Sequence, residues 1–205
     1  MSKRGLLSVG VFAPAIYLSL IAAGGLLFPG YDHARQMVSE LGGPEAPHPA
    51  VFNLGLMLTG GLTVLAGGVL FNALRERGGA LLASLLAALA IAVFGASLLI
   101  GGLYPLPDER HLAWGMGFAV QVAPLLTAWA LWRAPDMMAT KAFLLASFIA
   151  VNGLLAVMFG VGDLIDGDNV GLWQRAYGLA MFVWIAVTSL ALMRRPGARL
   201  LMRTA

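Results

Sequence analysis

The stretch GALLASLLAALAIAVFGASLLIGGL, residues 79–103, contains no charged side chain and is followed by Pro105 and Pro107. A helix needs about 20 mostly apolar residues to cross the hydrocarbon core of a bilayer. The stretch is long enough to do so, and the two prolines cannot continue a helix beyond it. The sequence therefore predicts a transmembrane helix over residues 79–103.

Apolar segments of similar length lie on both sides of this helix, and most of the prolines fall between them. They cover residues 5–28, 50–72, 111–132, 140–162 and 172–193. The first of them resembles a signal peptide, but it has spanning length and lacks a clear small-x-small cleavage site, so we expect it to be retained as a helix. The prediction is an all-α membrane bundle of six transmembrane helices that forms one domain over residues 1–205.

The composition agrees with a membrane protein. The chain has 205 residues, of which 60% are hydrophobic and 11% are charged, and its mean hydropathy is +0.84. Soluble domains contain about 45–50% apolar and about 25% charged residues, and no soluble core of this size could bury so much apolar surface. The chain has no cysteine, which excludes disulfides, thiolate nucleophiles and sulfur ligands to a metal.

The basic residues indicate how the bundle is oriented. Ten of the 13 Lys and Arg residues fall at the two termini and in the second and fourth connections: Lys3, Arg4, Arg75, Arg77, Arg133, Lys141, Arg194, Arg195, Arg199 and Arg203. Eight of the ten acidic residues fall on the opposite side. Because short cytoplasmic loops are enriched in Lys and Arg, both termini are predicted to be cytoplasmic.

The isoelectric point of about 9.7 follows from this topology, so nucleic acid is not an expected partner. Residues 194–199 contain three arginines and are expected to contact anionic lipid headgroups. Membrane lipids are the expected partners, and self-association into a homo-oligomer is left open. The Gly, Ala and Arg usage suggests a bacterial source, and hence a multi-pass protein of the inner membrane.

The side predicted to be external holds all three histidines, His33, His48 and His111. The longest connection, residues 29–49, lies on this side, and long ordered loops in compact proteins are usually functional. We expect this connection to fold back over the helix ends and to contain a short interfacial helix around residues 32–40.

Three readings of this outer face compete. In the first, His33 and His111 bind a divalent metal such as zinc together with Asp32 or Asp108, since zinc accepts imidazole and carboxylate ligands. No spacing here matches a known metal motif. In the second, the polar groups solvate the rim and cap helices, with Asp108 and Asp168 or Asn169 as N-caps. In the third, the groups surround a ligand other than a metal, and no cofactor is needed.

Polar residues inside the predicted helices are further candidates for ligand-binding residues, because an unpaired amide or charge is costly in hydrocarbon and needs a partner there. Asn53 and Asn152 fall within helices, and Asp163 and Arg175 are placed to form an ion pair across the outer boundary. Asn152 and Asp163 share one helix face, since 11 residues are about three turns. The sequence thus allows a ligand pocket bounded by Asn53, His111, Asn152 and Asp163.

Small residues and prolines give two local expectations. Gly60, Thr63 and Gly67 form a stripe on one helix face, which is typical of closely packed membrane helices. Pro14 and Pro124 fall inside predicted helices and are expected to kink them.

One motif in the long connection resembles a known family. It reads Tyr31-Asp32-His33-x-x-Gln36-x-x-Ser39-Glu40-Leu41-Gly42, and is followed by Pro49, Phe52, Asn53 and Gly55. A second motif, Tyr104-Pro105-x-Pro107-Asp108-x-x-His111, precedes the fourth helix, and a third runs from Gly171 to Tyr177. These motifs resemble the bacterial membrane-protein family known as domain of unknown function 998 along essentially the whole chain.

The same loop is more distantly similar to the DRAM membrane proteins and their GPI-anchor-remodelling relatives, whose Ser-Asp-x-Gly pattern has Glu40 in place of its aspartate here. That similarity implies a lipid-related role at the non-cytoplasmic face. The leading hypothesis is a protein that binds or handles a lipid, or another amphipathic ligand, at the outer leaflet under the 29–49 connection. Its candidate ligand-binding residues are His33, Glu40, Asn53, His111, Asn152, Asp163 and Arg175.

Two alternatives belong to other functional classes, and whether the chain is an enzyme is left open. The first is a metal-dependent membrane hydrolase that uses the outer histidines and acids. The second is a small transporter, which would need polar residues through the whole membrane. The cytoplasmic halves of the predicted helices are almost entirely apolar, which argues against a transporter.

Overall fold

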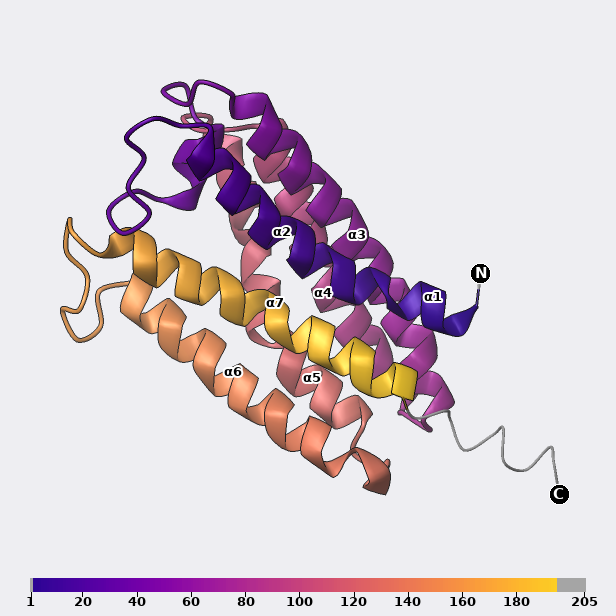
Figure 1. Cartoon of the computed structure of the whole chain (residues 1–205). Coiled ribbons are helices and arrows are strands. Elements are labelled where there is room, and N and C mark those ends of the chain that lie inside the picture. The colour runs from indigo at the N-terminus through magenta and orange to yellow at the C-terminus, as the bar shows by residue number, and fades with distance from the viewer. Residues whose placement is uncertain (1, 195–205) are drawn as a thin grey trace, which may run out of the picture.

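The computed structural model describes residues 2–194, and this part of the chain contains six apolar spans long enough to cross a membrane (Figure 1). The prediction of an all-α bundle with six such helices is confirmed. The helices are α1 (Lys3–Leu7) and α2 (Val9–Leu26), α3 (Pro49–Glu76), α4 (Leu81–Leu103), α5 (Ala123–Ala130), α6 (Met138–Met158) and α7 (Val170–Arg194). The 3₁₀ segments η1 (Val38–Gly42), η2 (Glu109–Gln121) and η3 (Pro135–Met137) complete the fold.

Successive spans run in opposite directions, so the connections gather at two ends of the bundle (Figure 1). We call the end with Lys3 and Arg77 the basic end. The other end, with the connections 27–48, 104–108 and 159–169, is called the acidic end, and it corresponds to the predicted external face. Arg195, Arg199 and Arg203 lie outside the described residues, as does most of the tail predicted to contact lipid headgroups.

The α3–α4 pair forms the most extensive interface, and glycines make it possible. A β-carbon on Gly60 would lie 2.6 Å from the carbonyl oxygen of Gly95, and one on Gly67 would lie 2.7 Å from that of Ala88. Such close backbone approach lets membrane helices gain dispersion contacts along their length. Thr63, between the two glycines, is fully buried. The predicted close-packing stripe is thus confirmed.

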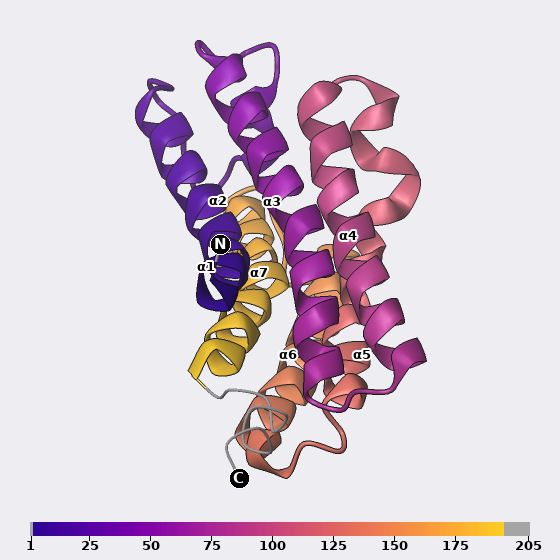
Figure 2. The same cartoon turned by 90° about the vertical axis from the view of Figure 1, so that its right-hand side faces the viewer.

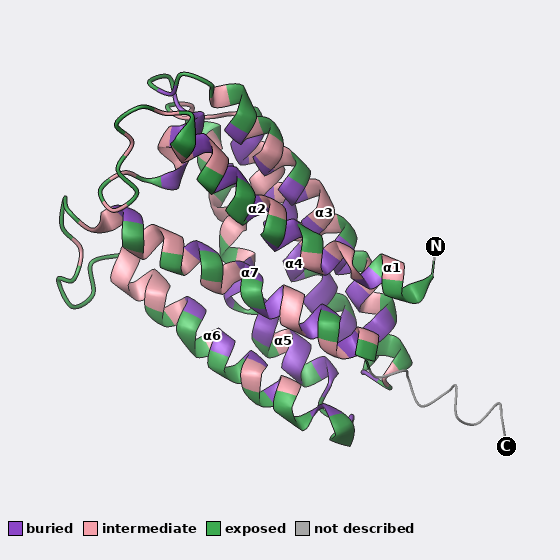
Figure 3. Ribbon diagram, viewed as in Figure 1, coloured by how far each residue is buried: buried purple, intermediate pink, exposed green. Residues whose placement is uncertain are grey.

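Aromatic packing joins the remaining helices to this pair. The Phe182 ring of α7 lies 4.7 Å from the Tyr17 ring of α2 and 5.2 Å from the Phe94 ring of α4. α6 lies at the periphery beside α7 and is the least covered span (Figure 3): 17% of its apolar window is buried, against 39–50% for the other five. α6 is therefore covered by the rest of the bundle along one side only.

At the basic end, both acidic residues pair with bases from other spans. Glu76, at the end of α3, accepts from Lys3, and Asp136 lies 2.7 Å from Nη1 of Arg77. The buried Lys141 donates to the carbonyl oxygen of Trp132 at 3.2 Å, just beyond α5. These contacts fix the helix ends relative to one another.

The fourth span departs from the predicted helix over residues 111–132. Its first part is the 3₁₀ segment η2, in which Ala113, Trp114 and Gly115 have positive φ values of 47°, 50° and 77°. Regular α-helix begins only at α5, with Pro124 in its first turn. Proline has no N–H to bond the carbonyl four residues earlier, so it is tolerated in a first turn but not in a helix interior. The expectation that Pro124 kinks a helix is wrong, because the α-helix starts there.

The other five spans agree with the predicted bounds to within a few residues. The third begins at Leu81 instead of residue 79, and the second extends to Glu76 instead of residue 72. α6 ends at Met158, four residues before the predicted end, because Gly160 and Gly162 adopt positive φ and begin the connection to α7.

Candidate functional site

The connection 27–48 is held against the start of α7 by Arg175. The Arg175 guanidinium donates to the Tyr31 hydroxyl at 2.6 Å and to the carbonyl oxygens of Gln36 and Gly171 at 2.9 and 2.8 Å. Burial raises the pKa of the Tyr31 phenol, and the nearby positive charge of Arg175 opposes that rise. Arg175 therefore joins the loop to the helix that carries it.

The ion pair predicted between Asp163 and Arg175 is not among the ion pairs of residues 2–194. Asp163 is exposed and has a φ of +50° in the connection after α6. The prediction assumed a helix that continues to residue 162 and directs Asp163 toward the bundle. α6 ends at Met158, so the chain has already turned before it reaches Asp163.

The first N–H groups of α7 are capped by a residue that is far away in the sequence. The N–H groups of Gly171 and Leu172 donate to the carbonyl oxygen of Ala34 at 2.7 and 3.2 Å. A β-carbon on Gly171 would lie 2.6 Å from the carbonyl oxygen of His33 and 2.8 Å from that of Ala34. Asp168 and Asn169 were predicted to cap this helix with their side chains, but the side chain of Asp168 binds Arg35 and that of Asn169 accepts from the backbone of Asp166.

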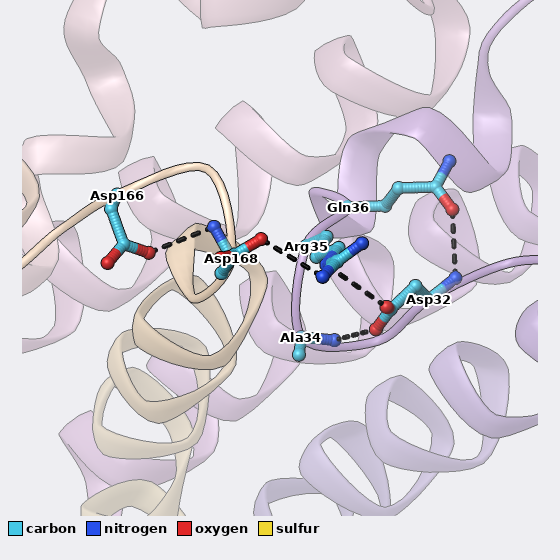
Figure 4. A network of polar contacts seen from close by, with 6 residues as sticks. All are labelled: Asp32, Ala34, Arg35, Gln36, Asp166 and Asp168. Carbon is cyan, nitrogen blue, oxygen red and sulfur yellow. Dashed lines mark hydrogen bonds and ion pairs between the residues drawn. The ribbon is translucent and has the colours of Figure 1, made fainter.

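A network of ion pairs and hydrogen bonds on the surface also holds the connection 27–48 beside the connection 159–169 (Figure 4). Arg35 bridges the two loops, with Nη2 3.1 Å from the Asp168 carboxylate and Nε 3.6 Å from that of Asp32. The Asp32 carboxylate also accepts from the N–H of Ala34 at 2.8 Å, and the side-chain oxygen of Gln36 accepts from the N–H of Asp32 at 2.9 Å. The polar residues of the first motif thus stabilise the loop itself.

Glu40 and Asn53 serve the same loop. The two carboxylate oxygens of Glu40 accept from the N–H of Met37 at 2.7 Å and from the side-chain amide of Gln36 at 3.0 Å. Asn53, near the start of α3, donates to the carbonyl oxygen of Gly42 at 3.0 Å. The short helix expected around residues 32–40 is found slightly later, as the 3₁₀ segment η1.

The two histidines proposed as metal ligands lie on different elements. The His33 ring contacts Tyr31 edge-on at 5.0 Å and packs over Gly25 of α2, whereas His111 binds carbonyl groups at the end of α4. Within residues 2–194, no group of three or more His, Asp or Glu side chains is placed to hold a metal ion. The described part of the chain therefore offers no ligand set for the hydrolase alternative.

Asp108, the other proposed metal ligand, acts as the predicted N-cap of the fourth span. Its carboxylate accepts from the backbone N–H of Arg110 at 2.9 Å and binds the Arg110 guanidinium at 2.9 and 2.6 Å. These hydrogen bonds lower the pKa of Asp108 to about 2. Arg110 also lies over the Tyr104 ring, 3.8 Å from its centroid.

A cavity of about 390 Å³ lies between α3, α4, η2 and α7. In Figure 2, η2 runs beside the upper part of α4 at the edge of the bundle. The residues that line the cavity are Leu56, Phe94, Ser97, Leu98, Gly101, His111, Leu112, Ala113, Gly115, Gly117, Phe118, Tyr177 and Met181. None of these residues is charged, and most are apolar.

The cavity lies in the half of the bundle nearest the acidic end. Its deepest lining residue on α4, Phe94, is nine residues before the helix end at Leu103, or about 14 Å at 1.5 Å per residue. On α7, Tyr177 is seven residues, or about 10 Å, from the first residue of that helix. Since the hydrocarbon core is about 30 Å thick, the cavity spans roughly one leaflet.

A buried polar cluster adjoins the cavity at Tyr177. The Gln121 side-chain amide donates to the Tyr177 hydroxyl, and the Asn152 amide donates to the carbonyl oxygens of Gln121 and Phe148 at 3.1 and 2.8 Å. Asn152 thereby satisfies a backbone carbonyl where η2 ends. Its role in the structure is to join α6 to the irregular fourth span.

Of the predicted ligand-binding residues, His111 lines this cavity. His33, Glu40 and Asn53 hold the connection 27–48, and Asn152, Asp163 and Arg175 lie at the positions described above. Sequence reasoning missed Ser97 and Tyr177 as lining residues. The one available signal for Ser97 was a hydroxyl in an otherwise almost wholly apolar helix, and such groups in membrane helices often have a polar neighbour or a ligand.

A family model described as "Protein of unknown function (DUF998)" matches residues 11–191. No curated protein and no solved structure matches the chain. The distant similarity to the DRAM and GPI-anchor-remodelling proteins finds no support in these comparisons and stays a prediction.

Proposed function

We propose that this chain, which belongs to the DUF998 family of proteins of unknown function and has six spans long enough to cross a membrane, binds the apolar part of a lipid or another amphipathic ligand. The proposed site is the cavity between α3, α4, η2 and α7. The sequence predicted a ligand under the connection expected at residues 29–49, and the proposal moves the ligand to the neighbouring wall formed by η2.

One observation carries this proposal, namely the irregular backbone of η2 along the cavity. Non-helical backbone at membrane depth has polar groups that lack helical partners, so it is tolerated only where it is buried in protein or lines a water-filled cavity. Ala113 and Gly115, two of the three consecutive residues with positive φ, line the cavity wall. Left-handed geometry costs an alanine roughly 1 kcal/mol, and a binding site is a place where such strain persists.

The shape and lining of the cavity support an amphipathic ligand. Its volume of about 390 Å³ falls within the range of small-molecule sites, about 300–1,000 Å³, which are mostly apolar with a few polar groups. If the basic end is cytoplasmic, as the positive-inside rule predicts, the ligand comes from the outer leaflet. The bacterial inner membrane is the proposed location, in line with the Gly, Ala and Arg usage of the chain.

Filling the cavity is expected to remove bound lipid. Gly117 lines the cavity, and its β-carbon would lie 3.5 Å from the Ser97 hydroxyl, so Gly117→Leu places three further carbons in the space without displacing backbone. Overpacking of about 1–3 kcal/mol predicts about a tenfold loss of co-purifying lipid. The measurement is native mass spectrometry of the full chain released from detergent, followed by lipid extraction.

The matched control is Gly153→Leu, on the lipid-facing side of α6, where an added β-carbon meets nothing within 4 Å. This variant is expected to keep its bound lipid. Equal lipid content in wild type, Gly117→Leu and Gly153→Leu, with all three folded, would contradict the proposed function.

A further inference from the structure

The hydrogen bonds of His111 determine which of its ring nitrogens carries a proton. Nδ1 lies 3.0 Å from the carbonyl oxygen of Gly101 and 3.1 Å from that of Tyr104. Both carbonyls can only accept, so the hydrogen-bond network assigns a proton to Nδ1. In a neutral imidazole the other nitrogen, Nε2, then carries a lone pair and acts as an acceptor.

Nε2 of His111 has no hydrogen-bond partner among the described residues. It is also not among the buried polar atoms that lack a partner in residues 2–194, and His111 is one of the residues that line the cavity. The two backbone carbonyls hold the ring through Nδ1 and set its tautomer. A residue of the cavity lining thus has a held ring with an unpaired acceptor.

A second acceptor lies on the facing helix. The Ser97 hydroxyl donates its hydrogen to the carbonyl oxygen of Phe94 at 2.7 Å, which leaves the oxygen lone pairs of Ser97 available. Ser97 lines the same cavity and is about nine-tenths buried. Tyr177, which also lines the cavity, accepts from Gln121 and keeps its own O–H as a donor. A ligand hydroxyl, which both donates and accepts, fits this set of groups.

The surroundings of the cavity argue for an uncharged head group. The lining has no charged side chain, and Arg110, adjacent to His111 in the chain, is occupied by Asp108 and stacked on Tyr104. A phosphate group would find no free cation in the cavity, and an ammonium group would find no carboxylate. Burying either charge without a partner is costly in an apolar site. A hydroxyl group donates one hydrogen bond and carries no charge.

We infer that the cavity binds long-chain alcohols, with the ligand hydroxyl donating to Nε2 of His111 and the chain lying against α4 and η2. This inference rests on the proposed function and deepens it. It makes His111 the residue that distinguishes an alcohol from its ether or phosphate ester.

The test uses the full chain in lipid nanodiscs and three photoreactive probes with the same hexadecyl chain and the same diazirine. The first probe ends in a hydroxyl, the second in a methyl ether and the third in a monophosphate. After irradiation, peptide mass spectrometry measures labelling of residues 94–118. One hydrogen bond to a neutral acceptor predicts labelling by the alcohol at about three- to tenfold lower mole fraction than by the ether, with the phosphate weakest.

Two substitutions separate recognition from structure. In His111→Asn the amide N–H₂ replaces the Nδ1 donor to the two carbonyls and nothing replaces Nε2, so the preference for alcohol over ether is expected to fall to about onefold. In His111→Gln the amide oxygen reaches the Nε2 position, so the preference is expected to persist while Tm falls because the carbonyl contacts are lost.

The outcomes are distinguishable. Equal labelling of wild type by alcohol and ether, or a preference unchanged in His111→Asn, would overturn the inference and leave the proposed function standing. If His111→Asn does not fold, His111→Gln is the second readout, and loss of the preference for alcohol over ether in that folded variant would likewise overturn the inference. Failure of all three probes to label residues 94–118 would overturn both.

Discussion

Gly60→Ala is expected to lower the free energy of unfolding by about 1–3 kcal/mol, because the α3–α4 interface leaves no room for a β-carbon. That carbon would lie 2.6 Å from the carbonyl oxygen of Gly95 and 2.8 Å from the amide nitrogen of Leu99. Both atoms belong to the backbone of α4, so neither can move without separating the helices. The measurement is unfolding of the purified protein by SDS titration, followed by circular dichroism.

Gly61→Ala provides the matched control for this prediction. Gly61 is the next residue of α3, and an added β-carbon there meets nothing within 4 Å. Alanine favours a helix interior over glycine by roughly 0.5–1 kcal/mol, so this variant is expected to be as stable as wild type or slightly more so. If the two variants unfold at the same SDS fraction, close packing does not hold α3 against α4.

Gly171→Ala is expected to release the connection 27–48 from the bundle. The added carbon would meet the carbonyl oxygens of His33 and Ala34 at 2.6 and 2.8 Å, and also that of Gln36. Accommodating it breaks the cap on α7 and the contacts of Arg175. A local cost of about 2 kcal/mol predicts roughly 30-fold faster amide hydrogen exchange in residues 31–42, measured by mass spectrometry.

The control for this change is Gly167→Ala, in the neighbouring connection, where a β-carbon meets nothing within 4 Å. Exchange in residues 31–42 should match wild type in that variant, and exchange in α4 should be unchanged in both. Wild-type protection of residues 31–42 in Gly171→Ala would mean that the loop is held by contacts other than those with α7.

The spans could be predicted from the sequence because a bilayer imposes a single length on every helix that crosses it. Residues 79–103 show this most clearly, since their apolar run ends at a proline-containing turn and α4 ends at Leu103. The fourth span is less apolar, with a mean hydropathy of 1.3 against 2.4 for α4, but it is still apolar enough to be predicted as a span, and hydropathy does not report backbone geometry. The left-handed turn at Ala113 and Trp114 depends on packing against α4 and could not be read from residue types.

The candidate site was predicted less well than the fold. Polar residues with a recognisable motif, such as Asp32, Glu40 and Asn53, mainly stabilise the connection 27–48. His111 was identified because it is polar and opens a predicted span. Most of the rest of the cavity wall consists of apolar residues from four elements, and in a membrane protein such residues look like any lipid-facing position until tertiary structure brings them together.

The exposed side of η2 also determines how affinity at this site has to be expressed. Leu112 and Phe118 line the cavity and are 75% and 49% exposed, and in the proposed membrane setting such exposed apolar side chains face the acyl chains of the lipid. A ligand that enters there arrives by lateral diffusion after partitioning into the membrane. Occupancy then follows its mole fraction among the lipids, and a dissociation constant in molar units would change with the amount of lipid or detergent in the assay.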